Sequence, residues 1–292
     1  MSPISPTELL GVSDERLAEL SAQFPQFDLP KLAEDYNRDG YVIVPQLFSP
    51  EEVEEIRQVF AKIQAEGVPG HYEPRKMELY HSAPEKDYPR MMHPHRYNER
   101  ARHYMLHPLM RPILEVCMGG EPIATQSMYF FKPPGGRGQA MHQDNFFLMV
   151  EPGTCIGAWT AIDDVDQENG CVMVVPGSHR LDLICHEPKA ETTRESDTAM
   201  RVPMPKDIER PVPAIMKSGD TLFFHGNVIH GSAPNRSKTR FRRSFVCHYA
   251  LGDLSKISNY YLPLVRMDGS EFTVPEANGG GPCGAWAGSA HY

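Results

Sequence analysis

The sequence predicts a mainly β fold with flanking helices, in which short strands form a double-sheet barrel or jelly roll. Helical patterns are confined to the front of the chain, up to Met118. From Ile123 onward, β-branched and aromatic runs alternate with turn residues about every ten positions, as antiparallel strands of a barrel do. There is no internal repeat and no clean linker, so the 292 residues are expected to form one domain. We divide it into a helical part of about 1–120, a barrel core of about 121–250 and a C-terminal extension of 251–292.

The front of the chain carries the clearest local signal. Ser49, Pro50 and Glu52 form an S-x-x-E capping box with proline in the first turn, which predicts the start of a helix. One apolar stripe follows at helical spacing: Val53, Ile56, Phe60 and Ile63. Further helical patterns are predicted at 14–24, 32–37 and 98–118, and a strand at 41–44.

The barrel core is predicted to contain strands at 126–131, 156–162, 171–175, 221–224 and 242–250. The Asn169-Gly170 pair between two of these strands predicts a β-hairpin. The irregular segment 66–97 is long enough to be a lid or binding loop, although a plain surface loop fits equally well. Residues 185–211 have the composition of an inserted loop, and after Leu251 the regular pattern fades.

Charge and composition restrict the class of partner. The net charge is −9 and the pI is about 5.8, which argues against a protein that binds nucleic acid or an anionic membrane. The first residues show neither a basic nor an apolar signal region, and no apolar run approaches the ~20 residues of a membrane span. We therefore expect a small-molecule partner and a cytoplasmic location. The sequence makes no prediction of oligomeric state.

The six cysteines stand at 117, 155, 171, 185, 247 and 283, without a C-x-x-C pair. This is neither zinc-site spacing nor the dense framework of a small disulfide-rich protein. Buried, reduced thiols are the expected state.

The stretch 141–145, Met-His-Gln-Asp-Asn, carries the main chemical signal. On an extended strand, His142 and Asp144 would lie on the same face and could bind one metal ion together. His230, 86 positions after Asp144 (230 − 144), is the candidate third ligand. Two histidines and one carboxylate on one face of an octahedron leave positions for a co-substrate and O₂, as in non-haem Fe(II) oxygenases.

Other polar residues compete for these roles. His225 and His248 are alternative third ligands, but structural hydrogen bonds are the preferred interpretation for both. The acidic run of Asp163, Asp164 and Asp166 lacks the spaced oxygen ligands of a calcium loop and is interpreted as a solvated turn.

Three blocks of sequence together resemble the phytanoyl-CoA 2-hydroxylase family of Fe(II)- and 2-oxoglutarate-dependent oxygenases, between about Tyr41 and Tyr249. The blocks are 142–144 (His-Gln-Asp), 158–179 from Ala-Trp-Thr-Ala through Asn-Gly-Cys to Pro-Gly-Ser-His, and 230–242 from His-Gly-Ser to Phe-Arg. The resemblance implies a double-stranded β-helix, a cupin-like barrel, with iron at its open end. It also implies Fe(II), 2-oxoglutarate and O₂ as cofactor and co-substrates.

Carried over position by position, the resemblance makes His142, Asp144 and His230 the iron ligands. Arg242 would bind the far carboxylate of 2-oxoglutarate, a role suited to the guanidinium fork, with Ser232 beside it. The family's arginine usually stands eleven residues after the distal histidine, where this chain has Phe241, so Arg240 is the alternative. Three further positions match the co-substrate pocket: Gln126, Met128 and Trp159. Trp159 could equally be a plain core residue.

The leading hypothesis is a hydroxylase that releases succinate and CO₂ while oxidising a C–H bond of a small metabolite. Within the same family, an acyl-CoA 2-hydroxylase is the alternative. From other classes, a His₂Asp zinc hydrolase and a non-catalytic small-molecule binder stay open. The residues expected to contact the substrate lie on one loop: His93, His95, Arg96 and Tyr97. They suit a compact molecule with one anionic or hydrogen-bonding end, which favours a free metabolite over a CoA thioester.

Overall fold

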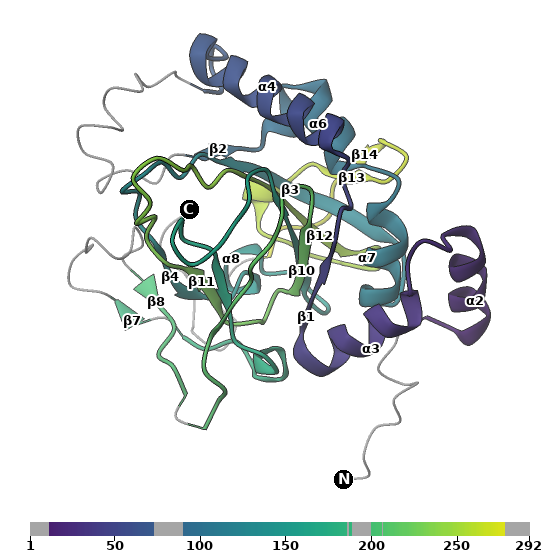
Figure 1. Cartoon of the computed structure of the whole chain (residues 1–292). Helices are drawn as coiled ribbons and strands as arrows, with labels where there is room; N and C mark the ends of the chain where they lie inside the picture. The colour runs from purple at the N-terminus through teal and green to yellow at the C-terminus, as the bar shows by residue number, and fades with distance from the viewer. Residues whose placement is uncertain (1–11, 73–89, 186, 189–199, 206, 278–292) are drawn as a thin grey trace.

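Two antiparallel sheets form the body of the protein (Figure 1). The structure is a computed structural model that describes residues 12–72, 90–185, 187–188, 200–205 and 207–277. Its larger sheet has eight strands: β1 (Tyr41–Val44), β10 (Thr221–His225), β5 (Cys155–Ala161), β12 (Ser244–Leu251), β3 (Pro122–Phe130), β13 (Leu264–Arg266) and β14 (Glu271–Phe272) in that order, with β2 (Arg90–Met92) also paired to β3. Its smaller sheet has four: β4 (Gln139–His142), β11 (His230–Ser232), β6 (Val172–Val174) and β9 (Val212–Pro213). The predicted fold class is confirmed.

All but one of the described α-helices pack on the outer side of the larger sheet, where Figure 1 shows α4 and α6 above β2 and β3. They are α2 (Asp14–Gln23), α3 (Leu29–Asp39), α4 (Pro50–Glu66), α6 (Glu99–Met105) and α7 (Met110–Met118). The capping box of α4 is present, and its four stripe residues are buried. One of them, Phe60, stacks on Tyr129 of β3 at a ring distance of 4.0 Å. Burial of a side chain of this size contributes about 1.5–3 kcal/mol, so the stripe attaches the helix to the sheet.

The larger sheet is covered on both faces, which divides the core in two. Along β3, Tyr129 faces the helices, whereas Met128 and Phe130 point into the barrel. The inner cluster also contains Trp159 of β5 and Val246 of β12. Every residue of β3 is buried, as expected for a strand covered on both sides. The inward row of these strands forms one wall of the site described below.

The predicted hairpin at Asn169-Gly170 is wrong. The strands before and after it, β5 and β6, belong to different sheets and do not pair. The Asn169 side chain instead donates to the carbonyl oxygens of Asp164 and Phe241, which shapes a corner between the sheets. Gly170 has φ 82°, and a Cβ there would lie 2.5 Å from the carbonyl oxygen of Ala233. The turn residues were recognised, but local sequence cannot show which sheet the next strand joins.

The segment after Leu251 is more regular than the sequence indicates. Strand β13 pairs with β3 in the larger sheet, and β14 pairs with β13. Ile257, Tyr261 and Leu264 are buried in a cluster of their own with residues of the barrel. The expected fading of structure in this extension is therefore corrected for the residues up to 277. The single domain stays a prediction.

The inserted loop 185–211 contains a short described hairpin of β7 (Glu187–Pro188) and β8 (Met200–Arg201). Cys117, Cys155, Cys171 and Cys247 are free thiols. Cys185 is disulfide-bonded, so the expectation of reduced cysteines throughout is wrong at this position, and its partner lies outside the described residues. Among the helices of the described part, none is long and apolar enough to cross a membrane.

Candidate active site

Pairing within the smaller sheet brings His142 and His230 together. They end β4 and begin β11, and their Cα atoms are direct partners across the two antiparallel strands. Their ring centroids are 4.2 Å apart, and both side chains are buried. The strands approach closely because Gly231 follows His230: a Cβ there would lie 2.7 Å from the carbonyl oxygen of Gln139. The backbone register thus places the two histidines side by side although they are far apart in the sequence.

Asp144 reaches the same point by a different route from the one expected. Strand β4 ends at His142, and Asp144 has helical backbone angles (φ −65°, ψ −37°) where it caps the short helix α8 (Asn145–Leu148). The two side chains therefore converge through a strand-to-helix turn and not by alternation along a strand. Between them, the Gln143 side chain donates to the carbonyl oxygen of Asn227 at 2.9 Å and accepts from the N–H of Ile184 at 2.8 Å. These bonds hold the turn to two neighbouring loops.

The three side chains have the geometry of a metal site. Asp144 Oδ1 lies 3.4 Å from His142 Nε2 and 3.6 Å from His230 Nε2. One ligand atom from each residue can be chosen so that all lie within 4.8 Å of one another. The Nδ1 atoms are turned away, to the carbonyl oxygens of Ala140 (2.8 Å) and Val228 (3.0 Å). Because Nδ1–H donates to those oxygens, Nε2 of each ring presents a lone pair to the centre.

The protonation states also suit a metal ion. Burial lowers the pKa of His230 to about 4, so its ring is neutral at pH 7. Burial alone would raise the pKa of Asp144, but the imidazoles of His230 and His248 and its hydrogen bonds hold it well below its ordinary value. A neutral imidazole and an ionised carboxylate are the forms that bind metal. The residues present therefore fit Fe(II).

The two competing histidines lie outside this group of three. His248 Nε2 donates to the other carboxylate oxygen of Asp144, Oδ2, at 2.8 Å. The ring of His225 accepts through Nδ1 from the backbone N–H of Asn227, at 3.1 Å. His248 thus holds a ligand without being in the cluster, and His225 makes a local structural bond. Nothing in the residue pattern signalled the contact of His248 with Asp144, because it depends on packing between β12 and α8.

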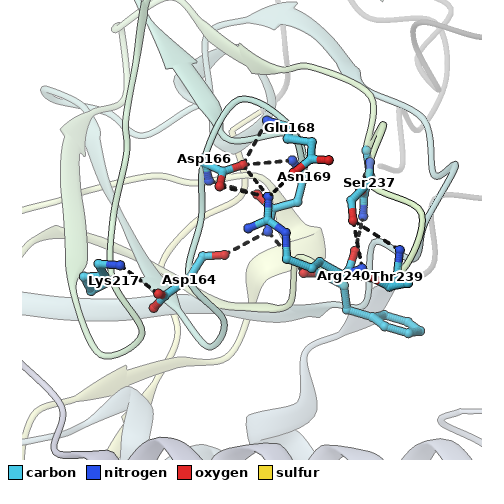
Figure 2. A network of polar contacts seen from close by, with 10 residues as sticks. Asp164, Asp166, Glu168, Asn169, Lys217, Ser237, Thr239 and Arg240 are labelled. Carbon is cyan, nitrogen blue, oxygen red and sulfur yellow. Dashed lines mark hydrogen bonds and ion pairs between the residues drawn. The ribbon is translucent and has the colours of Figure 1, made fainter.

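Arg240 and Arg242 differ sharply in environment. Arg240 is half-exposed and forms ion pairs with Asp166 (2.9 Å) and Glu168 (2.7 Å), in the surface network of Figure 2. Asp164 in the same network pairs with Lys217 at 2.9 Å. Arg242 is 1% exposed, and its guanidinium carbon lies 5.3 Å from the centre of the Trp159 ring. Only Arg242 of the two lines the cavity at the metal-binding cluster.

That cavity contains the metal-binding cluster at its wall. Ser232, Met128 and Trp159 line it, as the sequence led us to expect, together with the unforeseen Gln139 and His248. Gln126 points inward from the same row of β3 but is absent from the lining of this cavity.

Lys132 was missed by sequence reasoning. It is 1% exposed, and its ammonium group donates to Ser232 Oγ at 3.0 Å and to the carbonyl oxygen of Ala233. Ser232 Oγ also accepts from the N–H of Gln139 at 3.2 Å, so the hydroxyl hydrogen points away from both donors. The N–H of Arg242 donates to the carbonyl oxygen of Lys132 at 2.9 Å, which places two cationic residues side by side. A lysine at the end of a strand before Pro-Pro is usually exposed, so no local signal marked it.

Three of the four loop residues expected to contact substrate also have contacts within the protein. His95 Nδ1 lies 2.7 Å from Ser127 Oγ, Arg96 donates to the carbonyl oxygens of Tyr260 and Leu262, and the Tyr97 ring stacks on His71. His93 is the fourth. Its ring packs against Tyr260 at 4.7 Å and is 6% exposed.

Known structures share this architecture. The epimerase SnoN, solved in complex with Fe³⁺, alpha ketoglutarate and nogalamycin RO, has a TM-score of 0.62 at 23% identity, over 78% of this chain and 85% of that one. EctD from S. alaskensis, solved with 2-oxoglutarate and 5-hydroxyectoine, has a TM-score of 0.58 at 18% identity, over 86% and 78%. At such identities the likeness establishes the fold.

Sequence comparison decides the family. The family model for phytanoyl-CoA dioxygenase (PhyH) matches residues 36–244, which include every residue of the metal cluster and Arg242. The chain belongs to the phytanoyl-CoA dioxygenase family. Its members are non-haem iron oxygenases that use Fe(II), 2-oxoglutarate and O₂.

Two relatives within the phytanoyl-CoA dioxygenase family show the extent of the match. The rat protein "Phytanoyl-CoA dioxygenase, peroxisomal" is 30% identical over 233 residues, which are 76% of this chain and 68% of the rat protein. The rice "Phytanoyl-CoA dioxygenase 1" is 43% identical over 119 residues, but the match covers only 40% of this chain and 41% of the rice protein.

Proposed function

We propose that this protein is an Fe(II)- and 2-oxoglutarate-dependent dioxygenase that hydroxylates a C–H bond of a small metabolite. The observation that carries this proposal is that the cluster of His142, Asp144 and His230 and the buried side chain of Arg242 line the same cavity. A zinc hydrolase would need the three ligands but would give Arg242 no role.

His142 Nε2, Asp144 Oδ1 and His230 Nε2 would hold the iron. Fe(II) supplies the oxidative decarboxylation of 2-oxoglutarate to succinate and CO₂, in which one atom of O₂ enters succinate and the other enters the substrate C–H bond. Each residue is oriented by a hydrogen bond outside the cluster. His142 donates to the carbonyl oxygen of Ala140, His230 donates to that of Val228, and Asp144 accepts from His248. Such outer contacts hold ligand geometry in metal enzymes.

The far carboxylate of 2-oxoglutarate would bind to Arg242 and Ser232. Arg242 offers two N–H groups in a plane, and Ser232 is placed to donate its hydroxyl hydrogen because Lys132 and Gln139 donate to its oxygen. The ammonium of Lys132 adds a second positive charge. Trp159 lies against the Arg242 guanidinium and limits its motion.

The rest of the cavity wall excludes water from the reacting groups. Met128, Phe130, Val172, Phe224 and Val246 line it with apolar atoms. A dry wall protects the oxidising chemistry from side reactions. Because Asp144 supplies a carboxylate at the position that a chloride ligand would need, the expected product is an alcohol and not a chloride.

We further propose a free metabolite as substrate in preference to an acyl-CoA. The chain carries a net charge of −9 and offers little attraction to the phosphates of CoA. A cytoplasmic location is part of the proposal.

The test uses protein purified without oxygen and loaded with Fe(II). Addition of 2-oxoglutarate should produce the visible absorption of an iron–oxo-acid complex, and O₂ should then yield succinate. Asp144→Ala should abolish hydroxylation of the substrate found by mass spectrometry of a metabolite panel. Absence of succinate under all conditions, or a chlorinated product in chloride buffer, would refute the proposal; efficient turnover of phytanoyl-CoA with free acids ignored would refute the substrate class.

A further inference from the structure

A second polar cluster lies beside the metal-binding residues, at the end of the barrel opposite Arg242. The register of β3 and β12 pairs Phe130 with Ser244 and Gln126 with His248. Arg242 donates to Ser244 Oγ at 3.3 Å, so it lies at the end of the barrel where Phe130 and Ser244 pair. Gln126 and His248 stand four residues further along their strands, about 13 Å away. His248 contacts Asp144, so the metal-binding cluster lies between the two ends.

Several polar atoms of this second cluster have no hydrogen-bond partner in the described part of the chain. They are both amide atoms of Gln126, both ring nitrogens of His93 and Nδ1 of His248. Gln126 is 0% exposed and His248 1% exposed. Buried polar groups are nearly always hydrogen-bonded, so a concentration of this kind indicates a bound molecule.

His93 is held next to the other two residues by its backbone. It follows β2, whose Met92 is paired with Met128 of β3, and its N–H donates to the carbonyl oxygen of Ser127 at 2.8 Å. Its φ of 50° lies in the left-handed region, which is uncommon for a residue other than glycine and is often found at functional sites. The Tyr260 ring packs against its imidazole.

The side chains of His93 and Gln126 are rich in donors and acceptors and carry no charge. Burial, with a smaller effect of Arg96, lowers the pKa of His93 to about 2, so this ring is neutral. Gln126 offers two donors and an acceptor. The nearby guanidinium of Arg96 is turned to the carbonyl oxygens of Tyr260 and Leu262. A carboxylate or ammonium group buried between His93 and Gln126 would meet no counter-charge on either side chain, whereas a hydroxyl or carboxamide could hydrogen-bond with both.

We propose that His93, Gln126 and His248 form a subsite that binds an uncharged polar group of the substrate, a hydroxyl or a carboxamide. This rests on the proposed function, because it places the substrate on the side of the metal-binding cluster opposite the 2-oxoglutarate carboxylate. Gln126, which the sequence analysis placed in the co-substrate pocket, would then contact the substrate. The subsite also replaces the anionic end expected from the loop sequence with a neutral one.

The test compares four probes of equal chain length on the iron- and 2-oxoglutarate-loaded enzyme without oxygen: hexanamide, 1-hexanol, hexanoate and hexylamine. Calorimetry gives each dissociation constant, and we expect the amide and the alcohol to bind about tenfold tighter than the two charged probes. Gln126→Leu and His93→Phe should each abolish the preference. The matched control is Ser127→Ala, the next residue of β3, whose hydroxyl contacts His95; it should keep the preference.

Equal binding of the four probes would mean that the cluster holds only ordered water and would overturn the proposal. A preference for hexanoate or hexylamine, or an unchanged preference in Gln126→Leu, would overturn it too. The iron–oxo-acid absorption is recorded separately on the same samples. Its absence refutes the proposed function whatever the probes do, and calorimetry on the metal-free protein then still reports whether the subsite prefers neutral groups.

Discussion

Burial separates residues that look equivalent in the sequence. Arg240 and Arg242 flank the same phenylalanine, yet one pairs with surface carboxylates and the other is enclosed against Trp159 in the cavity. His225 and His248 are both strand histidines, yet only His248 touches Asp144. At the scale of the residue, the chemistry of the site follows from which side chains are withdrawn from water.

Replacement of the two arginines should therefore have unequal effects on 2-oxoglutarate binding. Arg242→Ala removes a charge-assisted contact in a buried pocket, worth on the order of 2–5 kcal/mol, whereas an exposed arginine is worth about 0–1. Anaerobic titration of each variant, followed by the absorption of the iron complex, measures the difference. An effect of Arg240→Ala as large as that of Arg242→Ala would reverse the assignment.

His248 should act on metal affinity through Asp144. Its bond to Oδ2 leaves Oδ1 to face the two histidines, so His248→Leu should release the carboxylate and weaken Fe(II) binding by about 10–100-fold. His248→Gln, which keeps an N–H donor, should recover part of the loss. Metal titration without oxygen gives the affinities. Equal affinity in the native and leucine proteins would show that Asp144 is oriented by other contacts.

At the scale of the element, the site depends on the smaller sheet. Strands β4 and β11 each contribute a histidine, and the turn from β4 into α8 contributes Asp144. The register shifts between His230 and Ser232, so Ser232 faces Gln139 and its hydroxyl meets the N–H of that residue. A change in the spacing of these two strands would therefore move all the functional groups together.

Gly231→Ala tests this dependence without touching a ligand. The new Cβ would lie 2.7 Å from the carbonyl oxygen of Gln139, a backbone atom that cannot rotate away, so the strands must separate. We expect Fe(II) affinity to fall by about tenfold or more, as for other distortions of metal-ligand support. In the control Gly120→Ala, the Cβ meets only the Leu251 side chain, and metal affinity should be unchanged. Native affinity in Gly231→Ala would contradict a rigid spacing.

At the scale of the whole molecule, the fold buries several imidazoles in neutral form. Burial lowers the pKa of His93 to about 2, of His95 to about 3, and of His225 and His230 to about 4. In the unfolded chain all four titrate near 6.5. Between these values the unfolded state binds more protons than the folded state, so stability must fall as the pH falls.

The metal-free protein should accordingly lose at least ~2 kcal/mol of unfolding free energy between pH 7 and pH 5, the contribution of one such histidine. Urea denaturation at several pH values measures it. His225→Gln removes one titrating group and should make the dependence shallower. Asp144 does not contribute to this loss of stability between pH 7 and pH 5. Its pKa is lowered from the ordinary value of 3.8, so its protonation affects stability only near and below that pH. Equal stability at pH 7 and pH 5 would contradict neutral burial.

The sequence by itself determined whatever depends on near neighbours along the chain. The capping box and stripe of α4, the strand 41–44, and the change from helical to β texture near residue 120 are local patterns, and the structure has each of them. The family could also be recognised from the sequence, because its motifs have fixed spacing that does not depend on knowledge of the packing.

Tertiary structure alone decided the rest, because it depends on which strands pair and in which register. It placed β5 and β6 in different sheets in spite of the Asn169-Gly170 turn. It also set His248 against Asp144 and Gln126 beside His248. Burial and cross-strand contacts join residues about a hundred positions apart, and their free energy is a property of the assembled sheets. A local sequence pattern therefore cannot predict these contacts.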